Sequence, residues 1–330
     1  MVITMKTPIS LLIDDPAPVV SVYYAHSAAP KTRDGRDLIK FVPDEFLPMF
    51  CDVIECRGIR GKFSVVPMPG NYGDIVNGID GVPREKLDAW LDMLKARIMP
   101  LFSIGPEMLT HHKAVDLATG KARSMNERDW ASTQDRTTLT PYITAALTLL
   151  RDAGIDSCGV TSPWDFGIEV EEEYVASISK AVYDVYKKKN AWYFLRSLRN
   201  TPNAKPWAAL DEDDRCVVSI PATTSDHFWQ TINTDDTSDE FVSRVADELI
   251  TADGSAGEMV QVLETGGYPI LLTHWQSLVS NGLFTGLRAL DEVARRINEY
   301  YADRVEWMSA EELMKLVVNA KASFPKPDFK

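Results

Sequence analysis

The stretch Ile9-Ser10-Leu11-Leu12-Ile13-Asp14-Asp15 decides the fold prediction, because it joins an apolar run to two adjacent carboxylates. Pro8 and Pro16 bound this stretch, and a short apolar run between such residues is typical of a buried strand. Proteins that alternate strands and helices place their chemistry at the C-terminal ends of the strands. Neighbouring strand residues point to opposite sides, which lets one carboxylate bind a metal while the other serves as a base. The alternative is a solvated pair of turn residues before a proline.

The same kind of apolar run recurs along the chain, and amphipathic stretches of helical length lie between most of the runs. The predicted strands are Ile9–Ile13, Lys62–Val66, Leu101–Ile104, Cys158–Thr161, Trp192–Leu195, Cys216–Ile220, Pro269–Thr273 and Val305–Met308. The predicted helices are Asp44–Arg57, Arg84–Ile98, Thr140–Ala153, Glu171–Lys189, Ser238–Leu263 and Leu283–Tyr301. This alternation predicts a parallel sheet with helical crossovers.

The number of strands selects among α/β architectures. Seven or eight strands favour a TIM-like (β/α) barrel, and no GxGxxG or Walker sequence supports an open nucleotide-binding sheet. Residues 199–215 form a polar, proline-containing connection without an obvious helix, so the barrel is expected to be irregular there. We therefore predict a single (β/α)-barrel domain over residues 1–330.

Composition narrows the function class. The chain has 35 basic and 48 acidic residues, a net charge of −13, which disfavours a nucleic-acid partner. The first apolar run ends after five residues, so neither a membrane segment nor a signal peptide is expected, and a cytoplasmic location is preferred over a secreted one whose signal peptide has been removed. A homo-oligomer is left open. The four cysteines lack metal-binding spacing and are expected to be buried, reduced thiols: Cys51, Cys56, Cys158 and Cys216.

Histidines and aromatic residues also follow predicted strands. His111 and His112 end one such segment, and His274 ends another. Rings beside carboxylates suit a carbohydrate platform, because sugar faces stack on rings while hydroxyls take polar partners. The alternative for each ring is a structural role at the end of the core. The predicted substrate-binding residues are Tyr72, Trp164, Asp165, His227, Trp229 and Trp275.

These segments together resemble the polysaccharide deacetylase superfamily, metal-dependent carbohydrate esterases on an irregular (β/α) barrel. Asp14-Asp15 looks like the first motif of that family, and Glu107-Met108-Leu109-Thr110-His111 looks like the stretch that leads to its metal-binding histidine. Ser162-Pro163-Trp164 is similar to part of its arginine-proline-aromatic motif. Gly61–Pro67 resembles its second strand, and Ile270–His274 resembles the strand that carries its catalytic histidine. The resemblance extends over roughly residues 8 to 310 and depends on the order of short motifs.

Two positions depart from the family pattern. The family has a second histidine four residues after the first, but Val115 occupies that position after His111. The family's arginine, which orients the base, is missing before Pro163, where Thr161 and Ser162 stand. The third metal ligand therefore stays open between two sets, Asp15 with His111 and Asp116, or Asp15 with His111 and His112.

The resemblance implies a mechanism. A divalent metal, by expectation zinc, would bind Asp15 and His111, Asp14 would be the base and His274 the acid. The substrate would be an N- or O-acetylated sugar or a related C–N or ester bond. One alternative is a glycoside hydrolase with Asp14 or Asp15 opposite another carboxylate, the candidates being Asp165, Glu169 and Asp226. Another is a carbohydrate-binding relative without catalysis. His26 and His227 have no spacing partner, which favours structural or substrate-contact roles.

Overall fold

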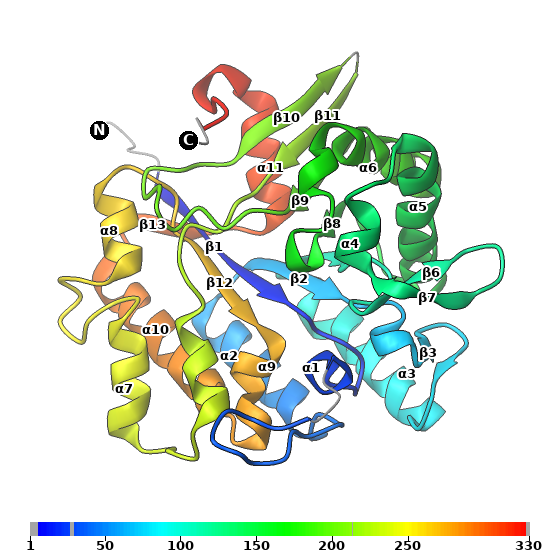
Figure 1. The fold of residues 1–330 in the computed structure, drawn as a ribbon. Coiled ribbons are helices and arrows are strands. Elements are labelled where there is room, and N and C mark those ends of the chain that lie inside the picture. Colours follow the sequence, from blue (N-terminus) through cyan, green and yellow to red (C-terminus); the bar gives the residue numbers. More distant parts are fainter. Residues whose placement is uncertain (1–5, 27–29, 213, 328–330) are drawn as a thin grey trace.

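Two main sheets organise the chain in the computed structural model, which describes residues 6–26, 30–212 and 214–327 (Figure 1). The first sheet has the order β12-β1-β2-β5, with β13 also pairing with β1, and the second has the order β10-β11-β9-β8. Every pair in these sheets is parallel except β10 with β11. Their strands are β1 (Thr7–Asp14), β2 (Gly61–Val65), β5 (Phe102–Pro106), β8 (Gly159–Thr161), β9 (Asn190–Phe194), β10 (Trp207–Glu212), β11 (Arg215–Ser219), β12 (Ile270–His274) and β13 (Val305–Trp307).

The two sheets meet on both flanks. On one flank Glu107, just beyond β5, bridges to Thr161 at the end of β8. Nearby, a Cβ on Gly105 would lie 2.6 Å from the carbonyl oxygen of Gly159. Glycine is required for this approach of the two backbones. On the other flank the Thr223 amide donates to the Ile270 carbonyl at 2.9 Å. The predicted mixed α/β fold with a parallel sheet is confirmed, whereas a closed barrel and a single domain stay predictions.

Helices cover the sheets, with α2 and α10 beside the first and α5 and α6 beside the second (Figure 1). The helices are α1 (Val22–Ala25), α2 (Phe46–Arg57), α3 (Arg84–Met93), α4 (Glu127–Ala131), α5 (Arg136–Asp152), α6 (Glu171–Tyr186), α7 (Asp239–Asp247), α8 (Glu258–Glu264), α9 (Trp275–Val279), α10 (Thr285–Tyr301) and α11 (Ala310–Asn319). Two antiparallel hairpins, β3 (Gly73–Asp74) with β4 (Gly78–Ile79) and β6 (Lys113–Asp116) with β7 (Lys121–Asn126), extend the connections after β2 and β5.

All eight predicted strands are present, but two connections differ from the prediction. The single helix expected over Ser238–Leu263 is divided into α7 and α8. Gly257 before α8 has φ = 117°, a conformation outside the helical region, and a Cβ at this position would lie 2.4 Å from the Leu249 carbonyl oxygen. The connection over residues 199–215, expected to be a polar loop without a helix, contains no helix but includes β10, an antiparallel partner of β11.

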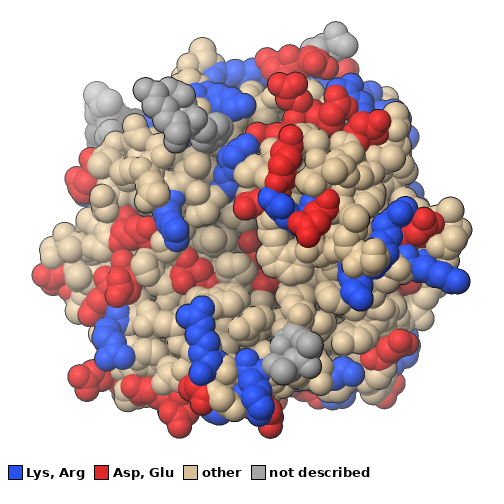
Figure 2. Space-filling view, viewed as in Figure 1, with Lys and Arg blue, Asp and Glu red and all other residues tan. Residues whose placement is uncertain are grey.

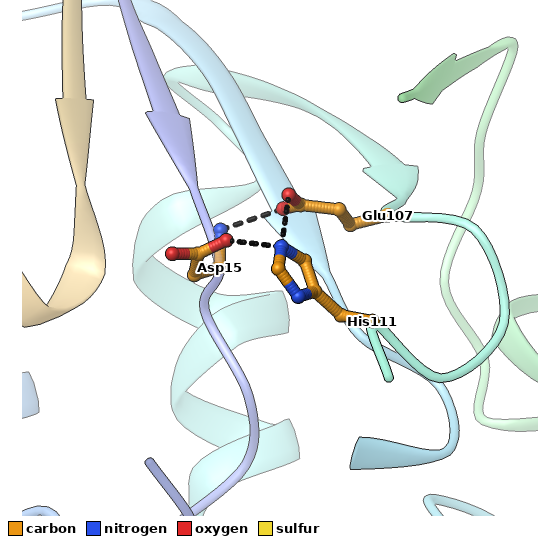
Figure 3. Close-up of side chains that lie close together, drawn as sticks. All are labelled: Asp15, Glu107 and His111. Carbon is orange, nitrogen blue, oxygen red and sulfur yellow. Dashed lines mark hydrogen bonds and ion pairs between the residues drawn. The ribbon is translucent and has the colours of Figure 1, made fainter. Parts of the chain in front are cut away.

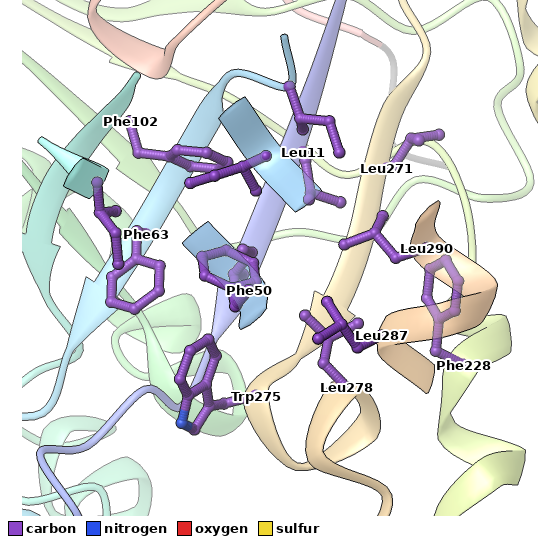
Figure 4. Packing of buried hydrophobic residues seen from close by; sticks show 14 of the residues in the cluster. Leu11, Phe50, Phe63, Phe102, Phe228, Leu271, Trp275, Leu278, Leu287 and Leu290 are labelled. Carbon is purple, nitrogen blue, oxygen red and sulfur yellow. The ribbon is translucent and has the colours of Figure 1, made fainter. Parts of the chain in front are cut away.

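Trp275 belongs to the hydrophobic core, which corrects its prediction as a substrate-binding residue. Its side chain is 2% exposed and packs edge-on against Phe46, Phe50 and Phe63, with ring centroids 4.7–5.3 Å apart (Figure 4). The prediction was wrong because Trp275, the first residue after β12, begins α9 and its side chain turns into the interior. Removing a buried indole of this kind typically costs about 3–5 kcal/mol of stability.

The surface mixes charges of both signs. Lys and Arg side chains are scattered among Asp and Glu over the face shown in Figure 2. Among the described residues, no helix combines the length and apolar character needed to cross a bilayer. All four cysteines are free, and three of them are buried as predicted. Cys56 is exposed instead, because it lies on the outer face of α2.

Candidate functional site

Three side chains converge at the C-terminal ends of β1 and β5 (Figure 3). Asp15 directly follows β1, Glu107 directly follows β5, and His111 comes four residues later. His111 Nε2 lies 2.7 Å from Asp15 Oδ1 and 3.2 Å from Glu107 Oε1. All three side chains are buried. We call this set the Asp-Glu-His cluster.

The second polar atom of each cluster residue is held by another group. Gln276 donates to Asp15 Oδ2, and the Asp15 amide donates to Glu107 Oε2 at 2.6 Å. His26 Nε2 donates to the His111 carbonyl oxygen at 2.5 Å and lies 2.9 Å from His111 Nδ1. This leaves Asp15 Oδ1, Glu107 Oε1 and His111 Nε2 directed at one another. Asp15 Oδ1 is buried and forms an ion pair with His111 Nε2. Such outer partners orient the ligands in protein metal sites.

The backbone around the cluster is strained and clamped. Asp15 and His111 have φ values of 70° and 49°, in the left-handed region that costs non-glycine residues about 1 kcal/mol or more. Glu127, at the start of α4, accepts hydrogen bonds from the amides of Leu109, Thr110 and His111 at 2.7–3.0 Å. This buried carboxylate holds the segment that presents the His111 ring.

The charges of the cluster are strongly coupled. Burial raises the pKa of Glu107 to about 7, with further contributions from Asp14 and Asp15. Burial opposes charge on Asp15 and His111 too, but their mutual attraction prevails, so the pKa of Asp15 falls and that of His111 rises well above its usual value. Burial, reinforced by His111, lowers the pKa of His26 to about 3. A proton on His111 therefore balances the carboxylates, and a cation at the same place would do the same.

Asp14 has a different partner from Asp15. It ends β1 and forms an ion pair with Lys62, a fully buried residue of β2. The Lys62 ammonium also donates to Ser64 Oγ at 2.8 Å and to Thr161 Oγ1 at 3.1 Å. Lys62 thus links β1, β2 and β8 beneath the cluster. The sequence prediction did not include Lys62, although a lysine inside an apolar strand indicates a buried partner of opposite charge.

His274 lies next to Asp14 across the β1–β12 pairing. Its Nδ1 is 2.7 Å from Asp226 Oδ2, which also accepts from Ser277 Oγ at 2.6 Å. Burial opposes its charge, but the bond to Asp226 and the charges of Asp15, Asp226 and Asp14 raise the pKa of His274 to about 9. His274 is therefore a cation at neutral pH.

Two predicted metal ligands lie outside the cluster. Asp116 is the last residue of β6, and Thr119 and Arg123 donate to its carboxylate. His112 stacks at 5.9 Å from His26 and contributes no atom to the cluster. Glu107 is the third member instead. The family pattern points to the position four residues after His111, whereas the partner lies four residues before it.

The predicted substrate-binding residues fall into two groups. Trp164 is 43% exposed with its ring 4.4 Å from that of His111, and Trp229 is 5.0 Å from His274. Asp165 is exposed beside Trp164. In contrast, His227 pairs with Glu258 at 2.7 Å, and Tyr72 packs on the core beneath Lys40. The two tryptophans are thus the predicted rings that lie beside the histidines of the site.

Comparison with known proteins was made on sequence and on structure. No protein-family model matches the chain, and no curated protein matches its sequence. A solved structure from Mycobacterium smegmatis, described provisionally as a polysaccharide deacetylase, matches with a TM-score of 0.51 and 13% identity over 86% of this chain and 80% of that one. The chain has the polysaccharide deacetylase fold. The resemblance predicted from the sequence is confirmed at this level.

Two other similar structures come from carbohydrate-related proteins. One is a carbohydrate esterase family 4 pseudoenzyme from Bacillus anthracis, with 10% identity, a TM-score of 0.39 and coverage of 94% of this chain and 66% of that one. The other is a branching enzyme of glycoside hydrolase family 57 type from Pyrococcus horikoshii, with 8% identity, a TM-score of 0.49 and coverage of 94% and 70%.

Proposed function

We propose that the protein is a metal-dependent hydrolase that removes an acetyl group from an N- or O-acetylated carbohydrate. The observation that carries this proposal is the convergence of Asp15 Oδ1, Glu107 Oε1 and His111 Nε2, each with its other polar atom held elsewhere. Carboxylate oxygens and an imidazole nitrogen are ligands of zinc and of similar divalent ions. The ligand atoms of the three residues lie within 4.8 Å of one another in a buried site, which fits such an ion.

Residues around the cluster would carry out the proton transfers of the reaction. A divalent ion bound at the cluster would polarise the substrate carbonyl and lower the pKa of a water. Asp14 accepts the proton of the attacking water, while Lys62 balances its charge in the buried site. His274, a cation with a pKa of about 9, donates a proton to the departing amine or alkoxide as the acyl bond breaks. The products are acetate and a free sugar amine or hydroxyl.

Lys62 supplies a cation where the resemblance calls for an arginine. That arginine would stand before Pro163, but Thr161 and Ser162 occupy the positions. The Lys62 ammonium donates to Thr161 Oγ1 and pairs with Asp14. A lysine of β2 therefore places a positive charge beside the base, Asp14. The departure from the family motif at Thr161 is thereby compensated in this chain.

Metal content and acetate release test the proposal together. The purified protein, after loading with Zn²⁺ and desalting, should retain about one ion per chain and release acetate from N-acetylated chitooligosaccharides or acetylated xylan. Asp15→Ala should retain no ion. A wild-type protein that binds no divalent ion overturns the proposal, and so does an ion whose binding is unchanged in Asp15→Ala.

A carbohydrate-binding protein without turnover is the second candidate. It is favoured by Glu107 in place of a histidine and by the internal charge balance of the cluster through a proton on His111. It predicts sugar binding at Trp164 and Trp229 with no acetate release. Paired-carboxylate glycoside hydrolysis has less support, because Glu169 pairs with Arg128 at the surface and Asp226 is bound to His274.

A further inference from the structure

The cluster contains one more carboxylate than the metal-binding motif of the resembling family. The pattern of the resembling family has two histidines four residues apart, and here Glu107 and His111 occupy positions with that spacing. With Asp15, the cluster offers two carboxylates and one imidazole. We infer that Glu107 shifts the metal preference of this site away from zinc toward a harder, oxygen-preferring divalent ion such as Mn²⁺. This inference rests on the proposed function.

The backbone of Glu107 is fixed so that its side chain faces the other two ligands. Its amide donates to the Val65 carbonyl at 3.0 Å, and it bridges to Thr161 on the other side. Glu107 therefore belongs to both sheets at their junction. Its side chain is 2% exposed and reaches Asp15 and His111. A carboxylate held in this way is a built-in member of the site.

The charge of the cluster favours a hard cation. Asp15 and Glu107 receive hydrogen bonds from neutral donors, the Gln276 amide and the Asp15 backbone N–H. Their negative charges are thus left for the bound ion or for a proton on His111. Carboxylate oxygens suit Mn²⁺ and Mg²⁺, whereas imidazole suits Zn²⁺ and other later transition metals. Zn²⁺ still binds more tightly than Mn²⁺ to most sites, so the effect appears in the ratio of the two affinities.

The experiment compares the full-length wild type with Glu107→His and Glu107→Gln after removal of metal by chelation. Calorimetric or competition titrations with Zn²⁺ and with Mn²⁺ give the two dissociation constants of each protein. The preference for Zn²⁺ over Mn²⁺ should be at least tenfold greater in Glu107→His than in the wild type. Glu107→Gln should lose at least tenfold in Mn²⁺ affinity and less in Zn²⁺ affinity. His112→Ala, which alters the histidine next to the cluster, is the matched control and should keep the wild-type ratio.

The outcomes separate the inference from the proposed function. If the wild type binds the ions but its preference for Zn²⁺ over Mn²⁺ is the same as that of Glu107→His, the inferred metal preference is wrong. The proposed hydrolase function is then unaffected. No binding of either ion by the wild type overturns both. If circular dichroism shows that Glu107→His is unfolded, Glu107→Gln decides, and equal losses for the two ions overturn the inference.

Discussion

Two histidine–carboxylate centres lie at the same end of the strands, and they differ in how their nitrogens are used. His111 presents Nε2 to two carboxylates, and its Nδ1 faces His26. His274 gives Nδ1 to the single carboxylate of Asp226. Both imidazoles have raised pKa values, but the carboxylates around His111 converge on one point, whereas Asp226 only orients the ring of His274. The difference predicts a metal ligand at His111 and a proton donor at His274.

The largest expected effect separates the two histidines by metal content. His111→Ala should abolish binding of a divalent ion, because it removes one of three converging ligands. His274→Ala should keep the ion and lose turnover. Elemental analysis of the loaded, desalted proteins measures this contrast. Retention of the ion by His111→Ala, or its loss from His274→Ala, would reverse the roles we assign to the two centres.

Asp14 sharpens the comparison, since it lies between the two centres and belongs to neither. Asp14→Asn should lower kcat by about 10²–10⁴-fold with unchanged metal content, as expected for a general base. Asp15→Asn should instead lose the metal. Acetate release and elemental analysis on the same preparations give both quantities. If Asp14→Asn is as active as the wild type, the residue is not part of the mechanism.

The affinity for the metal should depend on pH, because ligands of the His111 centre carry protons that a metal ion must displace. His111, with its raised pKa, and Glu107, with a pKa of about 7, must both lose protons before they bind an ion. The affinity should therefore rise with pH between about 6 and 8, by roughly tenfold per pH unit for each proton displaced. Titrations with Zn²⁺ in non-chelating buffers test the sign. An affinity that is flat or falls over this range would show that neither residue is a ligand.

The strands could be predicted from the sequence, but two residues of the site, Glu107 and Lys62, could not. A buried strand is an apolar run that can be read locally, and all eight runs became strands. Contacts between strands cannot be read in this way. Glu107 and Asp15 are joined by the pairing of β1, β2 and β5, and Lys62 meets Asp14 across β1 and β2. The spacing of Glu107 and His111 is visible in the sequence, but the family pattern calls for a histidine as the partner and not for a glutamate.

The same reason explains the tryptophans. Trp164 and Trp275 both follow predicted strands next to motif residues, and the sequence predicts substrate binding for both. Trp164 has φ = 47° and an exposed ring, whereas Trp275 enters a helix and turns into the core. Which way a side chain turns after a strand depends on the backbone angles of the connection, and the residue types alone do not determine these.

The acid role of the second centre can be tested through its carboxylate. The pKa of His274 is raised to about 9 in part by its bond to Asp226, so the protonated form needed for donation persists up to about that pH. In Asp226→Asn the loss of this charge should lower the pKa, and the alkaline limb of the kcat profile should move to lower pH. Rate measurements from about pH 6 to 10 test this. An unmoved alkaline limb would assign that limb to another group.

The smallest expected effect concerns Trp164, whose ring stands beside His111 at the surface. Its exposed face is available to stack on a sugar, so Trp164→Ala should weaken carbohydrate binding by about 1 kcal/mol, roughly fivefold. The stability cost should be well below the roughly 3–5 kcal/mol expected for the buried Trp275→Ala, the matched control. Denaturant unfolding and calorimetric titration with N-acetylated chitooligosaccharides measure the two quantities. A large loss of stability with unchanged sugar affinity would make Trp164 a structural lid over His111, and sugar recognition would then have to depend on Trp229 at the His274 centre.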